Sequence, residues 1–258
     1  MKRFVLFLSL VLLAGCVPQQ ARPQPPQVEL VSFSLVSLDP FTGFADLDIR
    51  LRLTNPNSFT LPLLDSTLSA ELAGAGFSMT LPALELPSNT PCETQTRLRV
   101  PIAQGVQALA SLVSGRPTRF RLQGEMQARV GPVNVPIGPF TLVDRDVTVN
   151  LNFTPPTLRL VEIRFENGTF KLVLETQNPN PIGFNLEGPV RLLIGGRNVA
   201  EANAQIASRP GNTSRGELSI RIQGFPGLGN VQVQANLVAR IPGILERPVV
   251  QVLEGFLR

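Results

Sequence analysis

Apolar and polar residues alternate over much of this chain beyond its first thirty residues. Two alternating runs, 45–53 and 170–176, are each followed by an asparagine–proline–asparagine phrase. A period of two is typical of a strand with one buried face. Proline has no N–H for a sheet ladder and asparagine bonds readily to its own backbone, so the phrase predicts a defined strand end. The phrases consist of Asn55, Pro56 and Asn57, and of Asn178, Pro179 and Asn180.

The two runs belong to a longer internal repeat. Segment 28–35 corresponds to 157–165, and in each of them two adjacent apolar residues interrupt the alternation, as a β-bulge would. A third strand is expected at 61–72 in the first repeat and at 184–194 in the second. Further strands are expected at 77–81, 95–100, 123–130, 200–206, 217–222 and 234–241, with closing strands at 146–153 and 247–253.

One helix is expected, at 104–114 in the first repeat. Val106, Leu109, Ala110 and Val113 recur at helical spacing, and Gly115 stands where a helix commonly ends. In the second repeat the glycine-rich segment 224–229 takes the place of this helix, and we expect it to be a loop.

The repeats predict two domains, at 28–154 and 157–258. Each has about seven short strands separated by turn residues, a pattern typical of a two-sheet sandwich. The predicted fold is therefore all-β, with two tandem antiparallel β-sandwiches of the fibronectin-III or immunoglobulin type. The join Thr154-Pro155-Pro156 is short and stiff, which predicts a restricted orientation between the domains.

The N-terminal residues carry an export signal. Lys2 and Arg3 precede an apolar run, 4–13, which is too short to span a bilayer and predicts a signal peptide at 1–15. The sequence Leu13-Ala14-Gly15-Cys16 resembles the bacterial lipobox. This resemblance implies that Cys16 is lipidated and becomes the first residue of the mature chain.

Lipidation would anchor the protein to a membrane, because each buried methylene contributes about 0.8 kcal/mol. Val17 resembles the residues that allow a lipoprotein to leave the inner membrane. The periplasmic face of the outer membrane is therefore the favoured location, and the cell surface and the outer face of the cytoplasmic membrane are alternatives. Segment 16–27 is rich in proline and glutamine, which predicts an extended tether.

The composition limits the possible chemistry. The chain has no histidine, tryptophan or tyrosine, which excludes Ser-His-Asp triads, Cys–His pairs and histidine-ligated metal sites. Its net charge of +4 comes without a run of basic residues, which argues against nucleic-acid binding. We therefore expect no enzyme activity, no catalytic residue, no metal site and no cofactor.

Three sets of polar residues could suggest chemistry, and a structural interpretation is favoured for each. Asp46 and Asp48 could serve acid–base chemistry or bind calcium, but Arg50 and Arg52 share their strand face, so cross-strand ion pairs are favoured. Cys92 has no basic neighbour in sequence and is expected to be a buried or incidental thiol. Segment 144–146, Asp-Arg-Asp, is expected to be a polar turn.

The chain resembles the type 2 late-embryogenesis-abundant family in four features. These are a strand that ends in Asn-Pro-Asn, an aromatic or aliphatic residue after it, a further strand and a late helix. This family is also called the water-stress and hypersensitive-response (WHy) domain. The resemblance covers nearly the whole mature chain as two copies. It implies a folded fibronectin-III-like sandwich, an association with desiccation or water stress, and no catalytic residues.

Three non-enzymatic functions fit these expectations. The first is a protective lipoprotein that binds exposed protein surfaces or lipid as water is lost. The second is a structural or assembly module that binds another envelope protein through its sheet edges. The third is a carrier of an apolar ligand held between the sheets. The expected partners are the membrane, through Cys16, and envelope proteins or lipids, but not nucleic acid.

Overall fold

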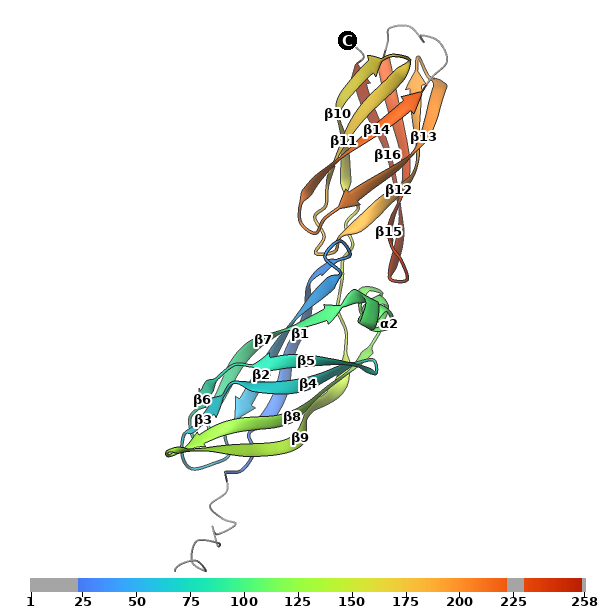
Figure 1. The fold of residues 1–258 in the computed structure, drawn as a ribbon. Coiled ribbons are helices and arrows are strands. Elements are labelled where there is room, and N and C mark those ends of the chain that lie inside the picture. The colour runs from blue at the N-terminus through green and yellow to red at the C-terminus, as the bar shows by residue number, and fades with distance from the viewer. Residues whose placement is uncertain (1–22, 222–229, 257–258) are drawn as a thin grey trace, which may run out of the picture.

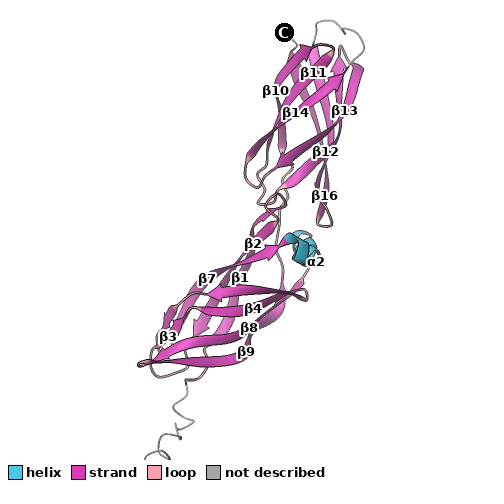
Figure 2. Ribbon diagram, viewed as in Figure 1, coloured by secondary structure: helices cyan, strands magenta, loops and turns pink. Residues whose placement is uncertain are grey.

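The computed structural model describes residues 23–221 and 230–256, and most of them lie in antiparallel strands (Figures 1 and 2). Among these residues there is one helix, and no helix is long and apolar enough to cross a membrane. The all-β prediction is confirmed. The predicted signal peptide and lipobox, the tether as far as residue 22, and the glycine-rich loop 224–229 lie outside the described residues.

The first half of the chain forms two sheets. One has the order β1-β2-β7, and the other contains β3 to β6, β8 and β9. Within the second sheet, β8 pairs on one side with β3 and β4, which lie one after the other along it. It pairs on the other side with β9. The elements are β1 (Gln27–Asp39), β2 (Phe44–Thr54), β3 (Leu61–Leu64), β4 (Ser66–Leu72), β5 (Ala75–Leu81), β6 (Leu84–Leu86), β7 (Pro91–Pro101), α2 (Ile102–Val113), β8 (Thr118–Val130) and β9 (Val133–Val147).

The second half repeats this topology with fewer interruptions. Its sheets have the orders β10-β11-β14 and β13-β12-β15-β16. The first of these sheets corresponds to β1-β2-β7. In the second, β12 corresponds to β3 and β4 together, β15 corresponds to β8, and β16 corresponds to β9. The strands are β10 (Thr157–Glu166), β11 (Thr169–Gln177), β12 (Phe184–Ile194), β13 (Arg197–Ser208), β14 (Thr213–Arg221), β15 (Asn230–Ile241) and β16 (Leu245–Phe256).

We interpret each pair of sheets as one sandwich unit. Alternate residues of the strands are buried between the two sheets, as in β2, where Ala45, Leu47 and Ile49 have no exposed surface. In the first unit, the rings of Phe33 in β1 and Phe120 in β8 join the two sheets, with centroids 5.3 Å apart. Below, the first unit is 23–153 and the second unit is 154–256.

The predicted β-bulges are confirmed in both units. The register of β1 shifts between Leu30 and Ser32, and that of β10 shifts between Leu160 and Glu162. The extra residue in each bulge is a valine, Val31 in one and Val161 in the other, and both valines are 38% exposed.

The third strand predicted at 61–72 is interrupted at Asp65, so it forms β3 and β4. At the break, side chains replace bonds of the strand ladder. Asp65 Oδ1 accepts from Ala83 N at 2.7 Å, and Ser66 Oγ accepts from Gln127 N at 3.0 Å. Short polar side chains of this kind compete with regular backbone pairing.

The prediction of a closing strand at 146–153 was wrong, because the last strand of the first unit is β9. β9 contains Pro136 and Pro139, and it tolerates them because among the described strands it pairs with β8 alone and is therefore an edge strand. Asp144 and Asp146 lie within β9, which corrects the prediction of a polar turn at 144–146.

The predicted helix is present as α2, and Gly115 ends it with a φ of 71°. Its buried face differs in part from the expected one. Leu109 and Val113 are buried as predicted, whereas Val106 and Ala110 are only partly covered. Gly105 allows close packing on β7, because a Cβ there would lie 2.6 Å from Val100 Cγ1.

Candidate functional site

The Asn-Pro-Asn phrase of the first unit forms a buried hydrogen-bond network around Asn55. Its Nδ2 donates to Phe59 O at 2.7 Å and to Leu86 O at 2.9 Å. Its Oδ1 accepts from the backbone N–H of Asn57 at 2.9 Å and from Asn57 Nδ2 at 2.7 Å. The predicted bond from asparagine to its own local backbone is therefore confirmed, and it fills the full bonding capacity of the side chain.

Asn57 extends this network to the beginning of the unit. Its Nδ2 donates to Gln24 O at 2.9 Å, and its Oδ1 accepts from Gln24 N at 2.8 Å. The chain just before β1 is thereby fixed to the end of β2, and Pro26 is buried. This corrects the predicted tether, which extended to residue 27, because the amide of Asn57 binds its last residues to the first unit.

The second unit contains the same network. Asn178 donates to Ile182 O at 2.8 Å and to Arg209 O at 3.1 Å, and it accepts both bonds from Asn180. Asn180 in turn binds both backbone groups of Thr154, at 2.8 and 2.7 Å. We call these the first and second asparagine networks. All four asparagines are at most 8% exposed.

The repeat thus extends further upstream than expected. Gln24 and Thr154 occupy the same place in the two units, and each is followed by two prolines. The shared Pro-Pro pairs at 25–26 and 155–156 are the sequence signal that could have revealed this. Because the second asparagine of each phrase binds the entering chain, the phrase closes a unit as well as ending a strand.

A strand bridge joins the two units directly. Leu38, near the end of β1, forms a parallel bridge with Ile182, just after the second phrase. Leu38 N donates to Pro181 O at 2.9 Å, and Gly183 N donates to Leu38 O at 2.7 Å. Figure 1 shows the end of the β1–β2 hairpin meeting the second unit at this point.

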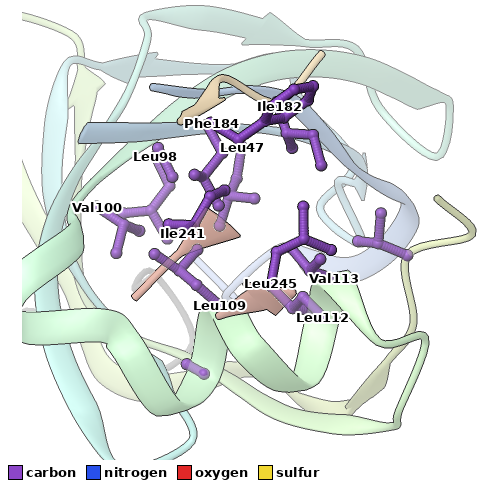
Figure 3. Close-up of a cluster of buried hydrophobic side chains, with 14 of the residues drawn as sticks. Leu47, Leu98, Val100, Leu109, Leu112, Val113, Ile182, Phe184, Ile241 and Leu245 are labelled. Carbon is purple, nitrogen blue, oxygen red and sulfur yellow. The ribbon is translucent and has the colours of Figure 1, made fainter. Parts of the chain in front are cut away.

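Apolar side chains from both units converge beside this bridge (Figure 3). Leu109 and Leu112 of α2 face Ile241 and Leu245, which flank the β15–β16 turn. All four are at most 9% exposed and belong to one continuous hydrophobic cluster that includes both units. The units therefore share part of a core, and the partly covered Val106 approaches Gly243 of the second unit.

A groove of about 490 Å³ lies at the edge of this junction. Ala110, Ser114 and Arg116 line it from the first unit, and residues 240–246 line it from the second. Arg240 in the groove already pairs with Glu246 at 3.1 Å. The groove has neither a nucleophile with a base nor a pair of free carboxylates, so it offers no evident catalytic chemistry.

The candidate carboxylates of β2 form cross-strand ion pairs, as favoured. Asp48 accepts from Arg97 Nε at 3.0 Å, and Asp46 lies 3.9 Å from Arg99 Nε. The hydrogen bond that Arg97 donates to Asp48, together with the negative charge of Asp48, raises the pKa of Arg97. In the described part of the chain, no group of three or more acidic or cysteine side chains could hold a metal ion. Cys92 is partly exposed, with Sγ 3.8 Å from Glu85 O.

Asp144 in β9 gives the protein a weakly acid-sensitive ion pair. Burial tends to raise its pKa, but hydrogen bonds from Arg119 and Arg121 prevail and hold the pKa below the usual 3.8. The Arg119 Nε to Asp144 Oδ1 distance is 2.7 Å. A carboxyl with a lowered folded-state pKa stabilises the fold above its unfolded pKa, and this contribution disappears as pH falls through the folded pKa.

We therefore expect Asp144→Asn to destabilise the protein at neutral pH and to lose this effect below pH 3.8. Urea unfolding of both proteins at about pH 7 and about pH 2.5 would measure it. Glu217→Gln is a matched control, because Glu217 is exposed on β14 and forms no ion pair with another described residue. An equal loss of stability at both pH values would contradict the assignment.

No protein-family model and no curated protein matches this chain. Among solved structures, it is similar to a protein from Archaeoglobus fulgidus, with 10% identity and a TM-score of 0.31 over 50% of this chain and 99% of that one. Red sea bream transglutaminase has 11% identity and a TM-score of 0.31 over 91% of this chain and 32% of its own length. A Bacteroides uniformis β-glucuronidase has 12% identity, a TM-score of 0.28 and coverage of 83% and 26%. The chain thus spans about a third or less of the two enzymes, and these likenesses carry no inference about activity.

Proposed function

We propose that this chain is a non-enzymatic lipoprotein of the bacterial envelope, with two units of the type 2 late-embryogenesis-abundant (WHy) kind. In this proposal it protects other envelope components by binding them as water is lost. Cys16 carries the lipid anchor, and the outer membrane is the favoured location.

The observation that carries the proposal is the pair of asparagine networks. Both side-chain N–H groups of Asn55 and of Asn178 donate to protein oxygens. Buried polar groups that are satisfied within the protein rigidify the fold and do not need bulk solvent. A protein whose strand ends are closed in this way can stay folded, and keep offering its surface, when water activity falls.

The length of the chain agrees with an anchored arrangement. Gln24, to which Asn57 binds, lies eight positions after Cys16 in the sequence. A fully extended chain gains at most about 3.5 Å per residue, so the end of the first unit near Asn57 would stand within roughly 28 Å of the lipid. The second unit would then point away from the membrane.

We expect the full chain to preserve a test enzyme through drying and rehydration several-fold better than an unrelated β-sandwich protein of equal mass. The recovered enzyme activity is the measurement. The variant Cys16→Ser should protect equally in solution but fail to protect membrane vesicles, since it lacks the anchor. Equal protection by the unrelated sandwich would reject the protective function.

The assembly function is the second candidate, and one observation favours it. Phe59 is 43% exposed at the end of the first unit, beside the first asparagine network. A large apolar side chain held outward next to a rigid network suits a protein contact. No comparable observation favours the carrier function, which stays a prediction.

A further inference from the structure

The two asparagine networks end at equivalent surfaces, of which only one is covered. Ile182, four residues after Asn178, is fully buried because Leu38 of the first unit lies against it. Phe59 stands four residues after Asn55 and is 43% exposed. The carbonyls of Ile182 and Phe59 accept the same asparagine bond, so the local backbone is alike in the two units.

The backbone groups beside these residues also correspond. Pro181 O and Gly183 N both bond to Leu38. Their counterparts in the first unit are Ser58 O and Thr60 N, which have no hydrogen-bond partner within residues 23–221 and 230–256, and both residues are exposed. A free acceptor and a free donor on either side of an apolar side chain are what an incoming strand end pairs with.

We propose that residues 58–60 form a docking surface for the strand end of another protein. The incoming segment is extended, runs parallel, and places an aliphatic side chain against Phe59 as Leu38 does against Ile182. The pattern of bonds is the one seen at Ile182, one donated by the segment to Ser58 O and one accepted from Thr60 N. The proposal deepens the assembly function and depends neither on lipidation nor on water stress.

A protein segment fits this surface better than lipid or a second copy of this chain. Acyl chains cannot pair with Ser58 O and Thr60 N, which would then lose their bonds to water without replacement. A second copy lacks a free strand end of the right length. β10 stops at Glu166 before its two-residue turn, whereas β1 continues to Asp39 and so includes Leu38, which pairs with Ala45 near the end of its hairpin.

One difference between the surfaces predicts which segments bind. A Cβ at Gly183 would lie 2.9 Å from Pro210 Cδ, 3.2 Å from Ser208 O and 3.3 Å from Pro40 Cδ, so glycine there leaves room for its own unit and also for the proline two residues after Leu38. The first unit has Thr60 at this position. The partner segment is therefore expected to lack proline at the second residue after its aliphatic side chain.

The capacity of the surface can be tested by joining residues 1–153 to residues 24–258, which places a first unit ahead of the complete pair. Leu38 of the added first unit should then bind Ser58 and Thr60 of the middle unit. We expect hydrogen exchange at that Thr60 amide to slow relative to the natural chain, with the contact between Pro40 and Thr60 limiting the effect. Thr60→Gly in the middle unit relieves this contact, and exchange at the same amide should then slow by at least about 100-fold. If exchange stays fast in both, the surface does not accept a strand and the proposal fails.

The natural occupant can be tested in intact cells with the full chain, by placing a photo-crosslinking phenylalanine analogue at position 59. An analogue at Val250, which is 64% exposed on β16, is the control. The expected product from position 59 alone is a crosslink to a protein segment with an aliphatic residue in an extended stretch, identified by mass spectrometry. A crosslink to phospholipid, to another copy of this chain or to nothing would overturn the proposal.

Discussion

Replacing Asn178 by alanine is expected to lower the free energy of unfolding by about 3–5 kcal/mol. The change removes four hydrogen bonds and leaves the carbonyls of Ile182 and Arg209 without these donors. An unsatisfied buried polar group costs about 1–3 kcal/mol. Asn180 also loses its hydrogen bonds to Asn178 Oδ1, so its side chain is less well fixed and its hydrogen bonds to Thr154 weaken. Urea unfolding followed by circular dichroism would measure the loss.

Two further variants separate the hydrogen bonds from the volume of the side chain. Asn178→Asp keeps the shape but has no N–H to donate, so we expect a loss at least as large. Asn203→Ala removes an exposed asparagine on β13 and should change stability by less than about 0.5 kcal/mol. A loss below about 1 kcal/mol for Asn178→Ala would mean that the network contributes little.

Local features of the chain could be predicted from the sequence because their causes are local. The bulges at Val31 and Val161 follow from paired apolar residues in an alternating strand. The turn at Asn55 follows from the ability of asparagine to bond its own backbone. The end of α2 follows from Gly115, which adopts a positive φ. Each of these needs only a few neighbouring residues.

The partners of the asparagines could not be predicted in the same way. Gln24 is 33 residues from Asn57, and Thr154 is 26 residues from Asn180. Gln24 and Thr154 bind the asparagines through backbone atoms, so these contacts do not require a particular residue type at either position. Only the repeated Pro-Pro pairs could have pointed to these contacts.

The junction between the units also depends on contacts that periodicity does not encode. Val106 and Ala110 fit the apolar stripe of α2, but they lie toward the second unit rather than deep in the first. The linker at 154–156 predicted a restricted orientation. The structure adds a second cause, since Leu38 pairs with Ile182 and α2 packs beside Ile241. Because the two units share part of a core beside the linker, they should resist rotation about it.

The difference between Ile182 and Phe59 provides the sharpest test of this junction. The two residues hold the same place in the repeat, so the same substitution can be made in two environments. We expect Ile182→Asp to lower the free energy of unfolding by about 4 kcal/mol or more, because it places a charge without a partner against Leu38. Phe59→Asp should cost less than about 1 kcal/mol, since that position is 43% exposed.

The same pair of variants reports on the coupling of the units. Ile182→Asp should also separate the units, so we expect calorimetry to show two unfolding transitions for this variant and one for the natural chain. Small-angle scattering should show a wider range of orientations between the units. Phe59→Asp should leave both measurements unchanged, and it should reduce the amount of the partner, once identified by crosslinking, that the full chain binds. Similar costs for the two variants would mean that Leu38 does not cover Ile182 in solution, and the inference about Phe59 would then lose its basis.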